Sequence, residues 1–197
     1  MSKVLIHYPK EFSCYPKFVR KVRRILSTIR SVELVFSDDP REYISRFCDE
    51  SENVVLGSQF DDVSLVLDRF AYAILFSAGE KADKTLRTSM EMAGITVRNI
   101  DVKLAKVVNI DKGDKYDVYI GRGSKYGNPY AMGFDGDRDE VIRKFAYDFE
   151  RGFILGEKDE RADLAKLAGK RLGCHCIPAP CHGDVIAEYI NSIDENR

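Results

Sequence analysis

Hydrophobic and polar positions in the first hundred residues alternate between two periods. Short apolar runs such as KVLIHY and AYAILFS are typical of buried strands, whereas Phe18, Val22 and Ile29 recur at the spacing of one helix face. Strands are predicted over 3–8, 32–36, 53–58, 71–77 and 95–100, and helices over 16–30, from Asp39 onward, and over 81–94. Strands that alternate with helices indicate crossover units, so we expect an α/β fold: a Rossmann-like, mainly parallel sheet with helices on both faces.

Local signals mark where several of these helices begin or end. Asp39 is predicted to be an N-cap, with Pro40 at the first helical position. Gly94 is predicted to close the helix over 81–94. Asp137 and Glu140 have the spacing of a capping box, in which each side chain accepts a hydrogen bond from the backbone of the other.

The pattern changes after residue 103. A charged connection with a predicted strand over 104–110 leads into YDVYIGRGSKYGNPYAMGF, which is rich in glycine and aromatic residues and is typical of a strand followed by a long loop. Helices are then predicted over 138–154, 160–168 and 183–193, with a strand in KRLGCHC. We therefore expect two domains, a Rossmann-like domain over 1–103 and a smaller α/β module over 104–197.

Composition narrows the class of protein. With 44% hydrophobic and 32% charged residues, the 197-residue chain has the composition of a globular protein. Its net charge of -1 gives no overall attraction to nucleic acids or anionic membranes, so nucleic-acid binding would need a local patch. The apolar runs are too short for a membrane helix or a signal peptide. We expect no membrane partner and a cytoplasmic location, where clustered cysteines more often bind metal or react than form disulfides.

A basic stripe follows the first predicted helix. Its members are Lys17, Arg20, Lys21, Arg23, Arg24 and Arg30. These side chains could contact phosphate groups, or they could form an ordinary solvated helix face, and the sequence leaves both interpretations open.

One stretch of the first half resembles a known superfamily. DRFAYAILFSAGEKADKTLRTSMEMAGITVRNI, over 68–100, combines an apolar strand, a turn, a helix and a strand that begins with Gly-Ile. It resembles the later half of the Rossmann-like SLOG superfamily, which includes the lonely-guy phosphoribohydrolases and the DprA-like DNA-processing proteins. The resemblance implies that the turn over 77–83 faces a nucleotide phosphate at the helix N-terminus. This turn has one glycine, Gly79, and Glu80 brings a negative charge to the phosphate position.

The second half resembles a different family. VYIGRGSKYGNPY and GKRLGCHCIPAPCHGDVIAEYIN match features of the family known as domain of unknown function 4326, which recurs in bacteriophage and bacterial proteins. The resemblance extends over about 107–191. Members often carry an aromatic residue at the position of His175, so the resemblance implies no shared role for this histidine. It implies no particular activity either, and the chemistry has to come from the residues themselves.

The segment GRGSKYGNP, over 121–129, is a candidate for anion or nucleotide binding. Its glycines allow close approach of the backbone to a ligand, and its polar side chains could donate to a phosphate or to a base edge. The predicted ligand contacts are Gly121, Arg122, Gly123, Ser124, Lys125 and Asn128. The spacing fits neither a dinucleotide-binding fingerprint nor a P-loop, and a structural turn with Pro129 as its rigid exit is the alternative.

The segment CHCIPAPCH concentrates thiols and imidazoles within nine residues. Cys174, Cys176, Cys181 and His182 could supply the four ligands that zinc prefers. If the strand continues to Cys176, the first two cysteines share one face and His175 points to the other.

Two further interpretations of this segment stay open. Cys181 could be a reactive thiol at the N-terminus of the last helix, with His182 or Asp184 assisting proton transfer. Alternatively, the thiols only pack, and Gly183 and Asp184 cap the helix.

These observations lead to a functional hypothesis. The chain is expected to bind a nucleotide derivative or a nucleic-acid base at the Gly-Arg-Gly-Ser loop and to process it, as a transferase or hydrolase, at the Cys/His cluster. Because ligands gather beyond the carboxyl ends of parallel strands, Arg122 should lie within reach of Cys181 and His182. The alternative is a non-catalytic nucleotide sensor or adaptor, phage-encoded and active in phage–host conflict. Zinc is the expected cofactor, and homo-oligomer formation is left open.

Overall fold

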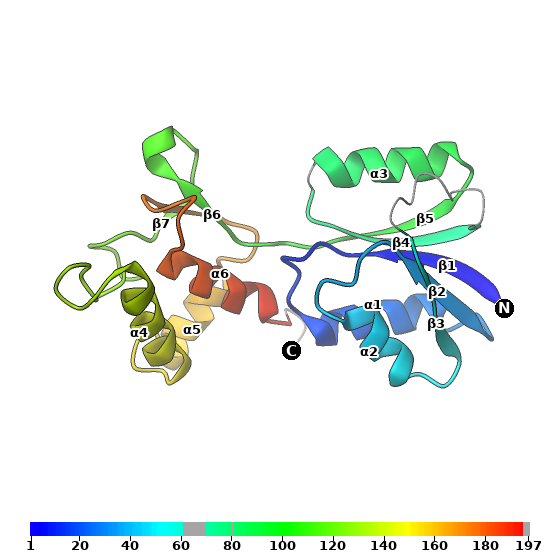
Figure 1. The fold of residues 1–197 in the computed structure, drawn as a ribbon, viewed down its shortest axis with the longest axis horizontal. Coiled ribbons are helices and arrows are strands. Elements are labelled where there is room, and N and C mark those ends of the chain that lie inside the picture. The colour runs from blue at the N-terminus through cyan, green and yellow to red at the C-terminus, as the bar shows by residue number, and fades with distance from the viewer. Residues whose placement is uncertain (61–69, 80, 195–197) are drawn as a thin grey trace. The chain divides into compact units, whose positions relative to one another are not determined.

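The computed structural model describes residues 1–60, 70–79 and 81–194 (Figure 1). The chain divides into two compact units, residues 1–102 and 103–197. Each unit has its own parallel sheet, of five strands in the first and three in the second. Within the described ranges, no helix combines the length and apolar character needed to cross a bilayer.

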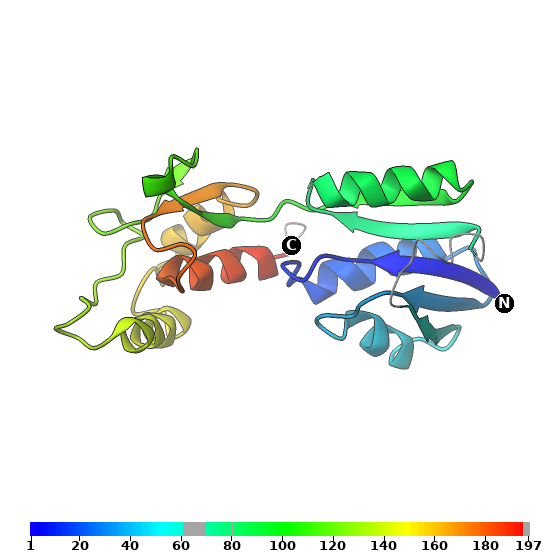
Figure 2. The same ribbon diagram turned by 45° about the horizontal axis from the view of Figure 1, so that its top comes forward.

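The first unit is a doubly wound sheet with the strand order β3-β2-β1-β4-β5. Its strands are β1 (Ser2–His7), β2 (Val32–Phe36), β3 (Val54–Gln59), β4 (Tyr72–Ser77) and β5 (Thr96–Asp101). Its helices are α1 (Tyr15–Leu26), α2 (Tyr43–Asp49) and α3 (Lys81–Met92). The chain runs outward from the central β1, returns and runs outward the other way, so right-handed crossovers put α1 and α2 on one face and α3 on the other (Figures 1 and 2). The predicted α/β class with a mainly parallel sheet is confirmed.

The core of this unit explains why its strands are so apolar. Val4, Leu5 and Ile6 are all buried because β1 is covered on both faces. Phe18 of α1 stacks on Phe76 of β4 with the ring centroids 5.3 Å apart. The unbroken apolar runs seen in the sequence are therefore the signature of a strand buried on both sides.

The predicted start of α2 is wrong. The helix begins at Tyr43, because residues 40–42 form a turn that the Glu42 N–H closes on the Asp39 carbonyl at 3.0 Å. Glu42 itself is left-handed, with φ 56°. The Asp39 carboxylate still bonds to the first turn of the helix, since it accepts hydrogen bonds from the amides of Ile44 and Ser45 at 3.0 and 2.9 Å.

The second unit has the strand order β6-β8-β7, all parallel. Its strands are β6 (Lys106–Asn109), β7 (Val118–Tyr119) and β8 (Arg171–Cys174), and a short 3-10 helix, η2 (Ile110–Lys112), follows β6. Its helices are α4 (Arg138–Glu150), α5 (Lys158–Ala165) and α6 (His182–Ser192). The central strand β8 pairs with both neighbours, and α6 packs on β6 and β8 and contacts α4 and α5.

Two polar contacts hold the helices of this unit in place. The predicted capping box of α4 is confirmed: Asp137 accepts the Glu140 amide at 2.9 Å, and Glu140 accepts the Asp137 amide at 3.1 Å. At the far end of α6, buried Asn191 accepts the Ala105 N–H at 2.7 Å and donates to the Ala105 carbonyl at 3.1 Å. The last helix is thereby fixed along the edge strand β6, with its N-terminus at the carboxyl end of the sheet.

Candidate functional site

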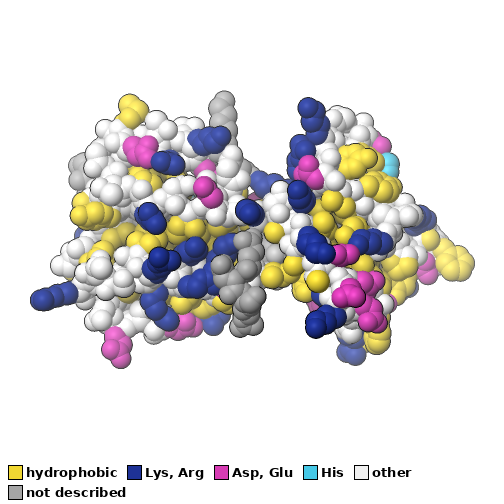
Figure 3. Space-filling view, turned by 180° about the vertical axis from the view of Figure 1, so that it is seen from behind, with side chains coloured by type: hydrophobic (Ala, Val, Ile, Leu, Met, Phe, Trp, Pro, Cys, Tyr) yellow, Lys and Arg dark blue, Asp and Glu magenta, His cyan; other side chains and the backbone are white. Residues whose placement is uncertain are grey.

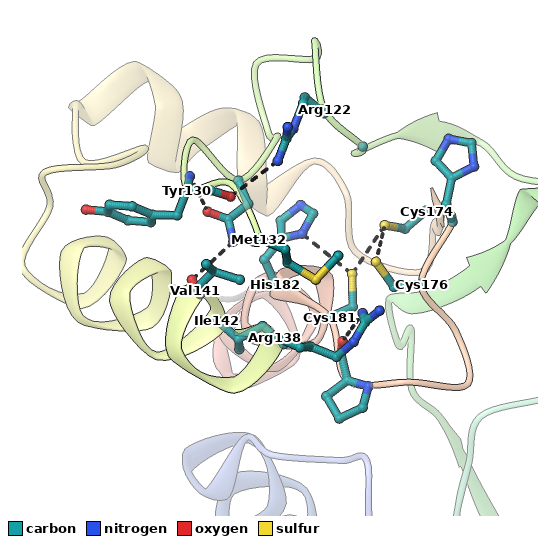
Figure 4. A pocket seen from close by; sticks show the side chains of 14 residues that line it. Arg122, Tyr130, Met132, Arg138, Val141, Ile142, Cys174, Cys176, Cys181 and His182 are labelled. Carbon is teal, nitrogen blue, oxygen red and sulfur yellow. Dashed lines mark hydrogen bonds between the residues drawn. The ribbon is translucent and has the colours of Figure 1, made fainter. Parts of the chain in front are cut away.

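The carboxyl ends of the three short strands meet at one edge of the second unit. Asn109 ends β6, Gly121 follows β7, and Cys174 ends β8, while α6 begins at His182 beside them. A cavity of about 160 Å³ opens at this edge (Figure 4). Its wall includes Gly121, Arg122, Cys174, Cys181 and His182, so the glycine loop and the Cys/His cluster border the same space.

Three cysteine sulfurs lie together at one side of the cavity. The Sγ atoms of Cys174 and Cys181 are 3.3 Å apart, and those of Cys174 and Cys176 are 3.7 Å apart. All three lie within 4.8 Å of one another, and no disulfide joins them. Thiolates at these separations are close enough to hold one metal ion. Cys174, Cys176 and Cys181 are called the cysteine group below.

The backbone at the cysteine group differs from the predicted strand. β8 ends at Cys174, and the segment after it turns away from the sheet. The sulfurs of Cys174 and Cys176 nevertheless lie side by side (Figure 4), while the ring nitrogens of His175 are directed to other partners. His175 Nδ1 is 2.8 Å from an Asp111 carboxylate oxygen, and Nε2 is 3.4 Å from the Tyr119 hydroxyl. The expected separation of His175 from the two cysteines is therefore present without the extended strand.

A hydrogen bond between Cys181 and Cys174 shifts the pKa values of these two thiols in opposite directions. The Cys181 thiol donates to Cys174 and lowers the pKa of Cys174 to about 5, against the opposing effect of burial. The same contact, followed by burial, raises the pKa of Cys181. Of the two, Cys174 is thus the thiol whose pKa is shifted toward the thiolate form. The thiolate is the form of cysteine that binds metals and attacks electrophiles.

Cys181 is also the N-cap of α6. Its Sγ accepts the Gly183 amide at 3.3 Å, and its own amide donates to Asp184 at 2.8 Å. Desolvation raises the pKa of the Asp184 carboxyl, against the hydrogen bond that it accepts from the Cys181 amide. Two of the three predicted catalytic side chains, Cys181 and Asp184, thus take part in starting the helix.

His182 is buried and contacts a single cysteine. Its Nε2 lies 2.9 Å from the Ile120 carbonyl, which can only accept, so Nε2 carries the hydrogen. Its Nδ1 lies 3.5 Å from Cys181 Sγ. His182 lies outside the group of three sulfurs that are mutually close.

Two arginines enter the cavity from opposite sides (Figure 4). Arg122 Nη2 is 3.4 Å from the Tyr130 carbonyl, and Arg138 Nη1 is 3.2 Å from the Pro180 carbonyl. Neither has a carboxylate partner in the part of the chain that the structure describes. Their positive charges are therefore available to an anion in the cavity.

The predicted ligand loop contributes three residues to the cavity wall: Gly121, Arg122 and Asn128. A side chain at Gly121 would overlap the Tyr119 ring, which explains the glycine there. Asn128 already bonds to α4 and to its own loop, since it donates to the Val141 carbonyl at 3.2 Å and accepts the Tyr130 amide at 2.9 Å.

The other predicted loop contacts do not line the cavity. Ser124 closes the turn, because its amide and its hydroxyl both donate to the Gly121 carbonyl, at 3.1 and 2.9 Å. Gly123 supplies a left-handed backbone with φ 89°. Lys125 is paired with Asp163 of α5 at 2.6 Å. The loop is therefore built largely as a self-bonded turn, and Arg122 is its one cation at the cavity.

Sequence reasoning missed several residues of this site. Arg138 and Met132 line the cavity, and neither belongs to a recognisable motif. Buried Asn109 is different: it stands at the carboxyl end of a strand, a position that could have marked it. Its Nδ2 donates to the His175 carbonyl at 3.4 Å and to the Ile177 carbonyl, so it holds the segment that carries Cys176.

In the turn over 77–83, which the SLOG resemblance assigns to phosphate binding, two backbone amides are hydrogen-bonded to side chains of the same turn. Asp83 accepts the Ala78 amide at 2.8 Å, and the Ser77 hydroxyl accepts the Gly79 amide at 3.2 Å. Asp83 is buried in this position. Glu80, the residue expected to oppose a phosphate, lies outside the described residues.

Comparisons with known proteins agree with both resemblances. Residues 1–108 match the minimal SLOG domain, and residues 105–192 match a domain of unknown function, DUF4326. An uncharacterized 12.4 kDa protein in the nrdA-td intergenic region of Enterobacteria phage T4 is 45% identical over 91 residues, which are 46% of this chain and 82% of the phage protein. No solved structure matches the chain. The chain therefore belongs to the minimal SLOG family through its first half and carries a DUF4326 domain in its second half.

Proposed function

We propose that the second unit binds a nucleotide derivative in the cavity beside the cysteine group and acts on it there. One observation carries the proposal: three clustered thiols border the same cavity as two arginines that have no carboxylate partner among the described residues. A pair of guanidinium groups suits a phosphate, because each can donate several hydrogen bonds to its oxygens. Val141 and Ile142 supply an apolar wall for a sugar or base.

The size of the cavity limits which part of the ligand it takes. A volume of about 160 Å³ corresponds to roughly five water molecules in the liquid, at ~30 Å³ each. A whole nucleotide is larger than this. We therefore propose that one end of the ligand, its phosphate, lies between Arg122 and Arg138 while the remainder extends out of the opening.

Zinc is the proposed metal of the cysteine group. Zinc is bound by thiolates in tetrahedral sites, and Cys174, Cys176 and Cys181 offer three sulfur ligands. His182 Nδ1 or an atom of the ligand would complete the site. When bound, zinc would act as a Lewis acid toward an oxygen of the ligand. Reduced thiols also suit the cytoplasm, which we propose as the compartment.

Calorimetry with nucleoside mono- and diphosphates, together with mass spectrometry of co-purified small molecules, tests the binding. Arg122→Ala should weaken binding about ten- to a hundredfold, because a charge-assisted hydrogen bond contributes about 1.5–3 kcal/mol. Lys125→Ala is the matched control, since it removes an equal charge from the same loop at a residue that pairs with Asp163 instead of lining the cavity. Equal losses in the two variants would contradict the proposal.

A non-catalytic nucleotide sensor is the second candidate, and one observation favours it. All three predicted catalytic side chains already have structural hydrogen bonds: Cys181 and Asp184 in the cap of α6, and His182 with the Ile120 carbonyl after β7. The phage relative supports the associated idea of a role in phage–host conflict. Chromatography of the bound nucleotide after incubation separates the candidates. Conversion supports the enzyme, and an intact ligand supports the sensor.

A further inference from the structure

A second surface, in the first unit, has no part in the proposed function. A hollow of about 520 Å³ lies between α1 and β5, lined by Lys21 and Arg24 of the helix and Arg98 of the strand. An adjoining hollow of about 450 Å³ shares Ile25 and Arg98 with it. Figure 3 shows Lys and Arg side chains gathered on this face of the unit, beside exposed apolar surface. The two hollows together are called the α1–β5 groove below.

The three cations of the first hollow have no acidic partner among the described residues. Within the described ranges, Lys21, Arg24 and Arg98 have no ion-pair partner, whereas Arg46 and Arg87 on neighbouring helices pair with glutamates at 2.8 Å. The acid that lines the groove, Asp101, is bonded instead to Asn99 Nδ2 at 2.7 Å. The whole chain has a net charge of -1, so this local excess of positive charge does not follow from composition. Unpaired cations around one concave surface attract a polyanion.

The second hollow adds an apolar surface to the charged one. Ile25, Ile29 and Ala73 line it, and Tyr72 stands beside them with half of its surface exposed. Among the described residues, α1 contacts β4 near its carboxyl end, through Phe18 and Phe76, while the beginning of β4 lines the hollow. The third helix, α3, lies on the opposite face of the sheet (Figures 1 and 2). An exposed aromatic ring beside unpaired cations is the combination that binds unpaired bases together with their phosphates.

We propose that the α1–β5 groove binds single-stranded nucleic acid. Lys21, Arg24 and Arg98 contact phosphates of the strand, and Tyr72 stacks on a base. A duplex fits this surface poorly, because its bases are already stacked and its grooves admit protruding elements rather than a concave one. A membrane surface fits poorly for a related reason, since interfacial binding needs apolar side chains that project from the protein. The basic stripe on the first helix thereby gains a function separate from the cavity of the second unit.

Fluorescence anisotropy of the full chain with a labelled single-stranded oligothymidylate tests this proposal. Neutralising three phosphates of a single strand gives a log-log salt slope of about -2, so affinity should fall roughly 20-fold between 50 and 200 mM salt. The variant Lys21→Ala/Arg24→Ala/Arg98→Ala should lose this salt dependence and bind at least tenfold more weakly at 50 mM salt. Tyr72→Ala should weaken binding about tenfold, the effect of losing one stacked base.

Two matched controls separate the groove from general charge and aromatic content. Lys10→Ala/Lys84→Ala/Lys112→Ala removes the same charge from three exposed lysines outside the groove, and Tyr147→Ala removes an exposed tyrosine of the second unit. Both should bind like the wild type, and circular dichroism should show every variant folded. Absence of wild-type binding at 50 mM salt, equal losses in the controls, or tighter binding to a duplex or to anionic vesicles would each overturn the proposal.

Discussion

The link between Asn109 and the cysteine segment offers the sharpest test of how the site is held. Asn109 is buried at the end of β6, donates to the carbonyls of His175 and Ile177, and accepts the Asp111 amide at 2.8 Å. Asn109→Asp keeps the shape and the acceptor but loses both donated hydrogen bonds. At about 1 kcal/mol each, the two bonds contribute about 2 kcal/mol to the free energy of unfolding.

Two measurements follow from that magnitude. For a unit of this size, about 2 kcal/mol lowers the melting temperature by roughly 10 °C, which calorimetry resolves. Because Asn109 supports the segment that carries Cys176, zinc affinity measured against a chromophoric chelator should fall about ten- to a hundredfold. Asn53→Ala, at an exposed asparagine of the first unit, is the control and should change neither value. An Asn109→Asp protein with unchanged melting temperature and zinc affinity would refute this account of the site.

Three other predictions concern single side chains. Elemental analysis of the wild type should find about one zinc per chain, and Cys176→Ser should lose this zinc. His175→Phe should retain it, since the ring nitrogens of His175 are directed to partners outside the cysteine group. Gly183→Ala should destabilise the second unit by about 1–3 kcal/mol in urea, because its Cβ would lie 2.5 Å from Ile120 Cδ1. The pKa of Asp39 is lowered: burial opposes the shift, but hydrogen bonds from Tyr8, Ser45 and Ile44 outweigh it. Ionised Asp39 thus stabilises the fold above about pH 4, and this contribution is lost as the pH falls through the folded-state pKa. In urea unfolding, the free energy of the Asp39→Asn variant should therefore depend less on pH in the acid range.

Features with local causes could be predicted from the sequence. The capping box of α4 depends on two side chains three residues apart and on no distant contact. Gly94 closes α3 with a left-handed φ of 79°, a conformation that favours glycine wherever it occurs. The apolar runs of β1 and β4 reveal burial on both faces of a parallel sheet. The fold class follows from such local patterns added together.

Features that depend on tertiary packing could not be predicted in the same way. Arg138 reaches the Pro180 carbonyl only because α4 packs beside the start of α6. Lys125 was expected at the ligand, but Asp163 of α5, 38 positions away, takes its charge. The loop contains two basic residues that could bind an anion, but only the tertiary structure determines that Lys125 pairs with Asp163 while Arg122 lines the cavity.

The central place of β8 has a consequence for the order of assembly. β6 and β7 form no ladder with each other, and each pairs only with β8, which the ribosome makes well after both. Neither early strand can form its ladder until β8 has emerged, so the small sheet forms late in synthesis, through contacts between distant parts of the chain. The same late event brings Asn109 of β6 to the carbonyls of His175 and Ile177. The segment that carries Cys176 therefore gains its support from β6 only when the sheet closes, so the cysteine group reaches its final geometry late in synthesis.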